Sequence, residues 1–310
     1  MQRRRFLKTA LAGTVAPGLP AGSREIPKRL YRDSVRLSLI GFGGIVVVGM
    51  DQKQANRTVA EAYERGVNYF DVAPSYWDGE AERKLGIALE PYRKNAFLAC
   101  KTMRRDAAGA ARELNESLRR LRTDWFDLYQ FHAVSSMKDV EQILSPGGAG
   151  ELFLRARKEG KVRYLGFSAH NVEAALALLE GFPCDSVLFP VNFVCYAQGN
   201  FGPQVLARAR EKGVARLALK ALAHTNWPKG TRQEHTAHPK CWYQPVEQRD
   251  LADRALRFTL SEDVTAAIPP GDERLFAMAL ELAAGFSPLS SQEREELLAA
   301  ARGVEPIFRA

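Results

Sequence analysis

Short apolar runs typical of β-strands alternate with stretches of helical periodicity along most of the chain. Two stretches show the helical spacing clearly: Ala55, Val59, Ala62 and Tyr63, and then Leu114, Leu118 and Leu121. The predicted strands end near Gly41, Asp71, Lys101, His132, Ser168, Val191, Lys220 and Ile268. Eight strands with intervening helices predict a closed parallel sheet, a (β/α)8 TIM barrel in a single domain.

The size and composition of the chain agree with this prediction. Its 310 residues, 46% of them hydrophobic, suffice for one large core, and barrels of about 250 residues commonly form one domain. No linker, internal repeat or low-complexity segment divides the sequence. A final capped amphipathic helix is expected around Ser290 to Ala301, packed against the barrel.

Four ionisable residues lie at or just after the ends of three successive predicted strands: Asp71, Tyr76, Lys101 and His132. Asp71 ends the run from Val67, and Pro74 then predicts a turn before Tyr76. Because parallel strands in a barrel place their carboxyl ends on one face, these four side chains are expected to lie close together.

Together the four groups can protonate a carbonyl oxygen. A phenol, with a reference pKa of about 10, keeps its proton at neutral pH, so Tyr76 is the candidate acid. The ammonium of Lys101 would stabilise the phenolate, and the carboxylate of Asp71 would hold that ammonium charged and oriented. The imidazole of His132 can hydrogen-bond the substrate oxygen or assist the proton transfer.

Each residue also has a purely structural interpretation. Asp71 can cap a turn, Lys101 can extend its ammonium to solvent, and His132 can be a hydrogen-bonded core histidine. Their occurrence as an ordered set at successive strand ends favours the functional interpretation.

The chain resembles the aldo-keto reductase superfamily, whose Asp, Tyr, Lys and His tetrad matches Asp71, Tyr76, Lys101 and His132 in order and approximate spacing. The supporting segments are GFGG (41–44), FDVAPSYWDGEAERKLG (70–86), FDLYQFH (126–132), KVRYLGFSAHN (161–171) and AAIPPGDE (266–273). The resemblance implies the barrel fold and NADPH or NADH bound across the barrel mouth. GFGG itself does not form a GxGxxG dinucleotide fingerprint.

The resemblance also implies cofactor contacts. Ser168 and Asn192 match positions that bind the nicotinamide amide, Asn192 replacing a common Gln. Lys220 and Leu222 fall in the segment that contacts the cofactor phosphates, and Gly271 and Glu273 fall in the adenosine-binding segment. Alternatively, Gly271 only forms a turn and Glu273 only begins a helix.

Three departures from the family pattern bear on the cofactor. Ala169 and His170 stand where an Asn often follows the serine, and Leu219 stands where an aromatic residue often stacks on the nicotinamide. Asp272 occupies a position that often meets the 2′-phosphate of NADPH, which a carboxylate would repel. Arg274 is the candidate partner if that phosphate is bound, and the preference between NADH and NADPH stays open.

A long polar segment after the seventh predicted strand contains His235, His238 and Cys241. Three such residues without a fourth at a recognisable spacing are weak evidence for zinc, so no metal site is predicted. The segment is expected to cap the substrate pocket with Trp227, Trp242 and Tyr243. The four cysteines form no CxxC pair, and Cys100 is expected to be a buried thiol.

The N-terminal segment has consecutive arginines, then Phe6, Leu7 and Lys8, and then a mildly apolar run without acidic residues. It resembles a twin-arginine signal, so residues 1–22 are predicted to be a signal peptide and residues 23–310 the barrel. Export to the periplasm is therefore expected, with a basic tail on a cytoplasmic protein as the alternative. Loss of the segment would lower the net charge from +8 to +4.

These observations predict an NAD(P)H-dependent oxidoreductase that reduces an aldehyde or ketone, which includes sugars that Trp77, Trp227 and Trp242 can stack on. The alternative is a nicotinamide-binding, redox-sensing regulatory subunit with little turnover. No nucleic-acid motif accompanies the basic residues. The longest apolar run is about half the roughly 20 residues that a membrane helix needs, so no membrane span is predicted. The sequence does not determine the oligomeric state.

Overall fold

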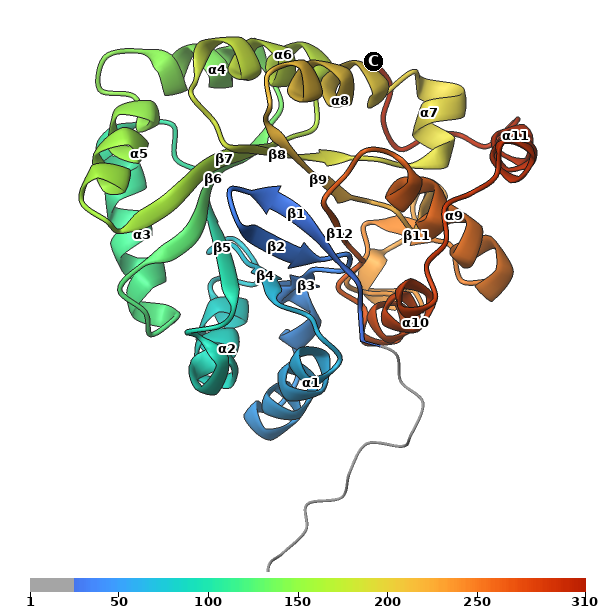
Figure 1. The fold of residues 1–310 in the computed structure, drawn as a ribbon, viewed down its shortest axis with the longest axis horizontal. Helices are drawn as coiled ribbons and strands as arrows, with labels where there is room; N and C mark the ends of the chain where they lie inside the picture. The colour runs from blue at the N-terminus through green and yellow to red at the C-terminus, as the bar shows by residue number, and fades with distance from the viewer. Residues whose placement is uncertain (1–24) are drawn as a thin grey trace, which may run out of the picture.

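The computed structural model describes residues 25–310, which form a (β/α)8 barrel (Figure 1). The signal peptide predicted over residues 1–22 lies outside the described residues, and its boundary at residue 22 stays a prediction. The barrel strands are β3 (Phe42–Gly43), β4 (Tyr69–Asp71), β5 (Phe97–Thr102), β6 (Phe126–Val134), β7 (Val162–Ala169), β8 (Ser186–Pro190), β9 (Ala215–Leu219) and β12 (Ala266–Ile268). All eight predicted strand ends lie within two residues of the observed ends, which confirms the fold prediction.

The eight strands pair in parallel in their order along the chain, from β3 to β12. The ring closes where Ile40, just before β3, bridges Ala267 of β12. Across this seam the Gly41 N–H donates to the Ala267 carbonyl at 2.9 Å, and the Ala267 N–H donates to the Leu39 carbonyl at 2.8 Å. A closed parallel sheet has no free edge, and its carboxyl ends form one rim.

The helices surround this ring (Figure 1). They are α1 (Gln52–Glu64), α2 (Glu80–Leu89), α3 (Ala107–Arg120), α4 (Met137–Leu144), α5 (Ala149–Lys158), α6 (Val172–Gly181), α7 (Phe193–Gly199), α8 (Pro203–Glu211), α9 (Arg249–Ser261), α10 (Glu273–Ala284) and α11 (Ser291–Ala300), with short 3-10 turns η1 (Gly44–Val47), η2 (Glu90–Tyr92) and η3 (Gln233–His235).

Local sequence explains where the helices begin and which faces they bury. A capping box between Asp51 and Gln54 begins α1, and Ala55, Val59 and Ala62 form its buried face. Every residue of β5 is buried, as expected for a parallel strand covered on both sides. Among the described helices, none is long and apolar enough to cross a membrane.

An N-terminal hairpin that the sequence analysis did not predict closes the amino-terminal end of the barrel. It consists of β1 (Lys28–Arg32) and β2 (Val35–Ser38), which lie inside the ring of strands in the view of Figure 1. The Tyr31 ring packs edge-on against Phe97 at 5.1 Å, and its hydroxyl lies 3.0 Å from Ser186 Oγ. Because Phe97 and Ser186 begin β5 and β8, this aromatic plug leaves the opposite, carboxyl end for the pocket.

Two further segments cover the carboxyl end. A hairpin of β10 (Ala223–Asn226) and β11 (Tyr243–Pro245) follows β9, where only a long polar segment was predicted. The predicted final helix is confirmed as α11, with its capping box between Ser290 and Glu293. Beyond it the chain returns to the barrel, where Phe308 stacks on Phe201 at 5.1 Å.

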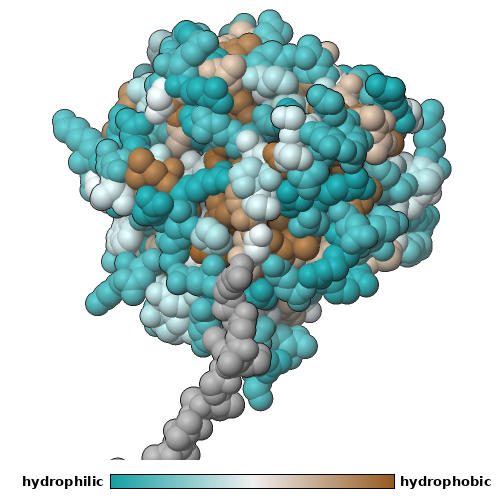
Figure 2. Space-filling model, turned by 45° about the vertical axis from the view of Figure 1, so that its right-hand side comes forward, coloured by the Kyte–Doolittle hydropathy of each residue, from teal (hydrophilic) through white to brown (hydrophobic). Residues whose placement is uncertain are grey.

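The face in Figure 2 is mostly hydrophilic and carries separate small groups of hydrophobic residues. Scattered exposed apolar residues are normal on soluble proteins, so these groups need no special role.

Candidate active site

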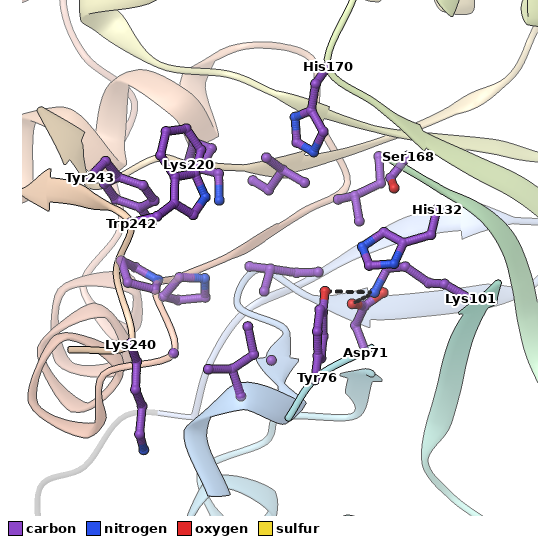
Figure 3. A pocket seen from close by; sticks show the side chains of 18 residues that line it. Asp71, Tyr76, Lys101, His132, Ser168, His170, Lys220, Lys240, Trp242 and Tyr243 are labelled. Carbon is purple, nitrogen blue, oxygen red and sulfur yellow. Dashed lines mark hydrogen bonds and ion pairs between the residues drawn. The ribbon is translucent and has the colours of Figure 1, made fainter. Parts of the chain in front are cut away.

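All four residues of the predicted tetrad line one cavity at the carboxyl end of the barrel (Figure 3). Asp71 is the last residue of β4, and Tyr76 lies in the turn that follows it. Lys101 and His132 come from β5 and β6. The cavity has a volume of about 230 Å³. Its lining residues are Gly43, Ile45, Asp71, Tyr76, Lys101, His132, Ser168, His170, Leu188, Leu219, Lys220, Lys240, Trp242, Tyr243, Ile268, Pro269, Pro270 and Gly271.

A buried ion pair between Lys101 and Asp71 is the centre of the tetrad. The Lys101 ammonium donates to Asp71 Oδ1, and both side chains are almost completely buried. The other oxygen, Asp71 Oδ2, accepts from Gln130 Nε2 at 3.0 Å and from the Tyr69 hydroxyl at 3.3 Å. A carboxylate bound on both oxygens is fixed in orientation, so Asp71 can hold Lys101 in place.

Lys101 in turn faces Tyr76. Its Nζ donates to the Tyr76 hydroxyl oxygen at 3.4 Å and to the Val72 carbonyl at 3.3 Å. Burial disfavours the charged form of Lys101, but Asp71 and Tyr76 outweigh burial, and the pKa of Lys101 is raised. The ammonium therefore stays protonated at neutral pH.

Tyr76 keeps its proton in this site. Burial raises the pKa of its hydroxyl, and the ammonium of Lys101 counteracts part of that increase. The ammonium favours the phenolate that would form when the proton leaves. Tyr76 is thus a stable proton donor whose conjugate base has a cation beside it.

The His132 ring lies edge-on to the Tyr76 ring, with 5.6 Å between the ring centroids and an angle of 82°. Its Nδ1 is 3.4 Å from the Ser75 hydroxyl, and its backbone carbonyl accepts from Arg105 at 2.8 Å. Burial, with the ammonium of Lys101 as the next cause, holds the pKa of His132 well below its ordinary value. The imidazole is therefore neutral at physiological pH.

Gln130 and Tyr69 are site residues that the sequence analysis missed. Gln130 is fully buried in β6, and Tyr69 is fully buried in β4. A signal for Gln130 was present, because a lone amide within the apolar run FDLYQFH must find a partner in the barrel interior. Nothing distinguished Tyr69 from an ordinary core aromatic residue.

Three of the six predicted cofactor residues line the same cavity: Ser168, Lys220 and Gly271. The Ser168 oxygen accepts from the Ala133 N–H at 2.8 Å, which leaves its own hydrogen free to donate. At Gly271 a Cβ atom would lie 2.3 Å from Ile45 Cγ2, so only glycine allows this close approach. Lys220 has φ of +70° at the end of β9.

The other three, Asn192, Leu222 and Glu273, do not line the cavity. The Asn192 amide is occupied within the protein: its oxygen accepts from two N–H groups at the start of α7, and its nitrogen donates to two backbone carbonyls. Leu222 is fully buried, and Glu273 pairs with Lys240 at 2.9 Å. Their cofactor roles stay predictions, and the internal hydrogen bonds of Asn192 do not favour its role.

The residues that depart from the family pattern lie in the cavity wall or at the start of α10. His170 and Leu219 line the cavity. Asp272 caps α10 by accepting from two backbone N–H groups, and its carboxylate also pairs with the Arg274 guanidinium at 3.2 Å. Burial alone would raise the pKa of Asp272, but hydrogen bonds from Arg274 and His238 outweigh it and lower this pKa. The charge of Asp272 is therefore balanced locally.

Of the three aromatic residues predicted to cap the pocket, Trp242, just before β11, and Tyr243, the first residue of β11, line the cavity. Trp227 does not line it and donates to the Cys241 carbonyl at 2.9 Å. His238 is buried against Asp272, with 3.0 Å between Nδ1 and Oδ2. Within residues 25–310, no cluster of three His, Cys, Asp or Glu side chains is arranged to hold a metal ion. All four cysteines are free and buried, which confirms the prediction for Cys100.

Fold and site together define a (β/α)8-barrel protein with the four predicted tetrad residues in its carboxyl-end cavity. A model of the aldo/keto reductase family matches residues 39–272, most of the chain. The chain therefore belongs to the aldo/keto reductase family.

Similar proteins agree with this assignment. The aldo-keto reductase YhdN of Bacillus subtilis is 28% identical over 200 residues, which are 61% of this chain and 58% of that protein. The chain spans between 48% and 65% of the length of the first three curated relatives that it matches.

Two solved structures support the fold. The holo form of aldo-keto reductase AKR11C1 from Bacillus halodurans has a TM-score of 0.69 at 23% identity, covering 91% of this chain and 99% of that chain. An aldo-keto reductase from Klebsiella pneumoniae in complex with NADPH has a TM-score of 0.67 at 20% identity, covering 89% and 94% of the two chains.

Proposed function

We propose that this protein reduces an aldehyde or ketone to an alcohol with NADPH or NADH as the hydride donor. The observation that carries the proposal is the chain of contacts from the buried Asp71 carboxylate through the Lys101 ammonium to the Tyr76 hydroxyl, beside His132. It places a proton donor and its stabilising cation in a cavity open to a small carbonyl compound.

The lining residues fit a nicotinamide. Ser168 has a hydroxyl hydrogen that no described residue accepts, Leu219 and Ile268 offer apolar surface, and Gly271 lets Ile45 pack closely at the cavity wall. The NADPH complex of the Klebsiella pneumoniae relative supports the same cofactor class. When bound there, the nicotinamide would supply the hydride.

The residues of the tetrad would move the proton. The carbonyl oxygen would lie between the Tyr76 hydroxyl and the neutral His132 ring, and Tyr76 would donate its proton as negative charge develops on that oxygen. Lys101 would stabilise the phenolate, while Asp71 keeps Lys101 charged. Because these groups are fixed before substrate arrives, little reorganisation would accompany the proton transfer.

The Tyr76→Phe variant tests this mechanism, because it removes the donated proton and keeps the ring. We expect its kcat to fall by at least about a hundredfold, the lower range for a lost general acid, while nucleotide binding measured by tryptophan fluorescence is retained. Tyr92→Phe is a matched control, since its ring stacks on Tyr63 away from the cavity. Wild-type activity in Tyr76→Phe would refute the mechanism. Tight nucleotide binding without turnover by the wild type would favour a regulatory subunit.

Export is a separate proposal. We propose that residues 1–22 direct the folded protein through the twin-arginine pathway to the periplasm, on the basis of the consecutive arginines and the apolar run that follows. Fractionation of cells that express the full chain and a variant with Arg4 and Arg5 changed to Lys tests this. Equal periplasmic amounts of the two proteins, or none of either, would contradict the proposal.

A further inference from the structure

Lys220 places a positive charge in the cavity without a carboxylate beside it. Its Nζ lies over the Tyr243 ring at 4.8 Å and over the Trp242 ring at 5.1 Å. In the described part of the chain, no Asp or Glu forms an ion pair with it, and the facing Cys241 is a buried neutral thiol. An ammonium in such a partly dry site gains strongly from an anionic partner.

His170 adds a second group that lacks a partner. Its Nδ1 is buried and makes no hydrogen bond within the described residues, although the residue lines the cavity. The ring is held in place by stacking on Phe308, with 5.1 Å between centroids and 22° between planes. A buried ring nitrogen without a partner is rare in folded proteins, which indicates that a ligand completes it.

The other cations that line this cavity have partners. Lys101 is paired with Asp71, and Lys240 with Glu273. Lys220 therefore gives the cavity an excess of positive charge. In Figure 3, Lys220 and His170 lie across the cavity from Tyr76 and Asp71. A molecule that contacts both of these opposite walls must therefore span the cavity.

We propose that Lys220 and His170 form a subsite for an anionic oxygen, and that the natural substrate is a small aldehyde or ketone that carries a carboxylate. This rests on the proposed function, because the carbonyl must lie at Tyr76 and His132 for the carboxylate to reach the opposite wall. The ammonium of Lys220 binds one carboxylate oxygen, and an N–H of the His170 ring donates to the carboxylate.

A phosphate of the bound cofactor has the same chemistry and is the other possible source of the anion. The two sources differ in what Lys220 would affect. A substrate carboxylate makes Lys220 matter only for acidic substrates, whereas a cofactor phosphate makes it matter for nucleotide binding and hence for every substrate.

The test compares acids with their uncharged methyl esters as substrates of the full chain. The probes are 4-oxobutanoate and 4-formylbenzoate, each paired with its methyl ester, and kcat/KM is measured with saturating nucleotide. The variants are Lys220→Gln, Lys220→Arg and His170→Phe. Lys229→Gln is the matched control, because this exposed lysine lies in the β10–β11 segment outside the cavity.

We expect the wild type to prefer at least one acid over its ester by about tenfold or more, the value of one charge-assisted hydrogen bond. Lys220→Gln should abolish this preference, because it should lower kcat/KM for the acid about tenfold more than for its methyl ester. Lys220→Arg should restore most of the preference, His170→Phe should reduce it, and Lys229→Gln should leave it unchanged.

Two results would overturn the proposal. One is a wild type that reduces the esters as well as the acids. The other is a Lys220→Gln variant that loses nucleotide affinity and turns over acids and esters equally poorly, because the anion would then belong to the cofactor. Failure of the proposed function itself looks different: the wild type would reduce neither acids nor esters.

Discussion

Replacing Asp71 by Asn should destabilise the protein strongly, because it leaves the Lys101 ammonium buried without a counter-ion. Lys101 is 1% exposed and Asp71 is 2% exposed, so neither can turn toward water. The amide also cannot satisfy both neighbours. Lys101 and Gln130 are both donors to Asp71, and an Asn side chain has only one acceptor oxygen for the two.

The size of the effect follows from this burial. Removing one partner of a buried ion pair costs about 3–5 kcal/mol, whereas an exposed pair contributes about 0–1 kcal/mol. Asp263, which is 47% exposed and pairs with Arg210 and Arg216, provides the matched control. We expect Asp71→Asn to lower the free energy of unfolding by about 3–5 kcal/mol, Asp263→Asn by less than about 1 kcal/mol, and Asp71→Asn/Lys101→Met by less than Asp71→Asn alone.

Urea denaturation followed by tryptophan fluorescence measures these differences. In the wild type the folded pKa of Lys101 lies above its unfolded value of about 10.4, so the stabilisation is complete below that pH and is lost as the pH rises through the folded pKa. In Asp71→Asn, burial without a partner lowers the folded pKa instead. The deficit of the variant should therefore be largest near neutral pH and smaller at pH 10.

Two results would refute the reasoning. One is an Asp71→Asn variant that is no less stable than Asp263→Asn. The other is an Asp71→Asn/Lys101→Met variant that is less stable than Asp71→Asn alone. Either would mean that the buried ammonium does not depend on this carboxylate.

Two further predictions concern the cofactor and pH. Gly271→Val should raise the nucleotide Kd in a fluorescence titration and lower the free energy of unfolding by about 1–3 kcal/mol, because its Cβ would meet Ile45 at 2.3 Å. The control Gly285→Ala has no neighbour closer than 3.9 Å and should change both quantities little. In initial-rate assays, kcat/KM for a methyl ester should not change from about pH 6 to 9, because His132 is already neutral and the pKa of Tyr76 is raised. For the matching acid it should fall above about pH 8, because burial lowers the pKa of Lys220 to about 8. A step near pH 6.5 with the ester, or parallel acid and ester profiles, would contradict the second prediction.

The sequence alone predicted the barrel and the tetrad. Each strand is a short apolar run whose last residue can be found from local pattern, and parallel strands in a closed barrel bring their carboxyl ends to one rim. The proximity of residues as distant in sequence as Asp71 and His132 can therefore be predicted without knowing any side-chain contact. The capping box of α11 was equally readable, because it involves only Ser290 and Glu293.

Other features depended on contacts between segments that are distant in sequence. Tyr69, which donates to Asp71, and the aromatic plug around Tyr31 carry ordinary core or strand patterns. Gln130 stands out as a lone amide in an apolar run, but its partner Asp71 is 59 residues away in sequence. Asn192 matched a cofactor position, yet its hydrogen bonds are made within the protein. The sequence assigned His238 no defined role, and the structure places it in contact with Asp272.

Local periodicity and strand ends depend on a few neighbouring residues, so the sequence by itself determined the fold class, the four tetrad residues and the end of the barrel where they meet. Whether a polar group has a partner depends on every segment packed around it. Only the tertiary structure decided that Gln130 and Tyr69 bind Asp71, and that Lys220 has no carboxylate partner among the described residues. It also decided that the chain end brings Phe308 against His170.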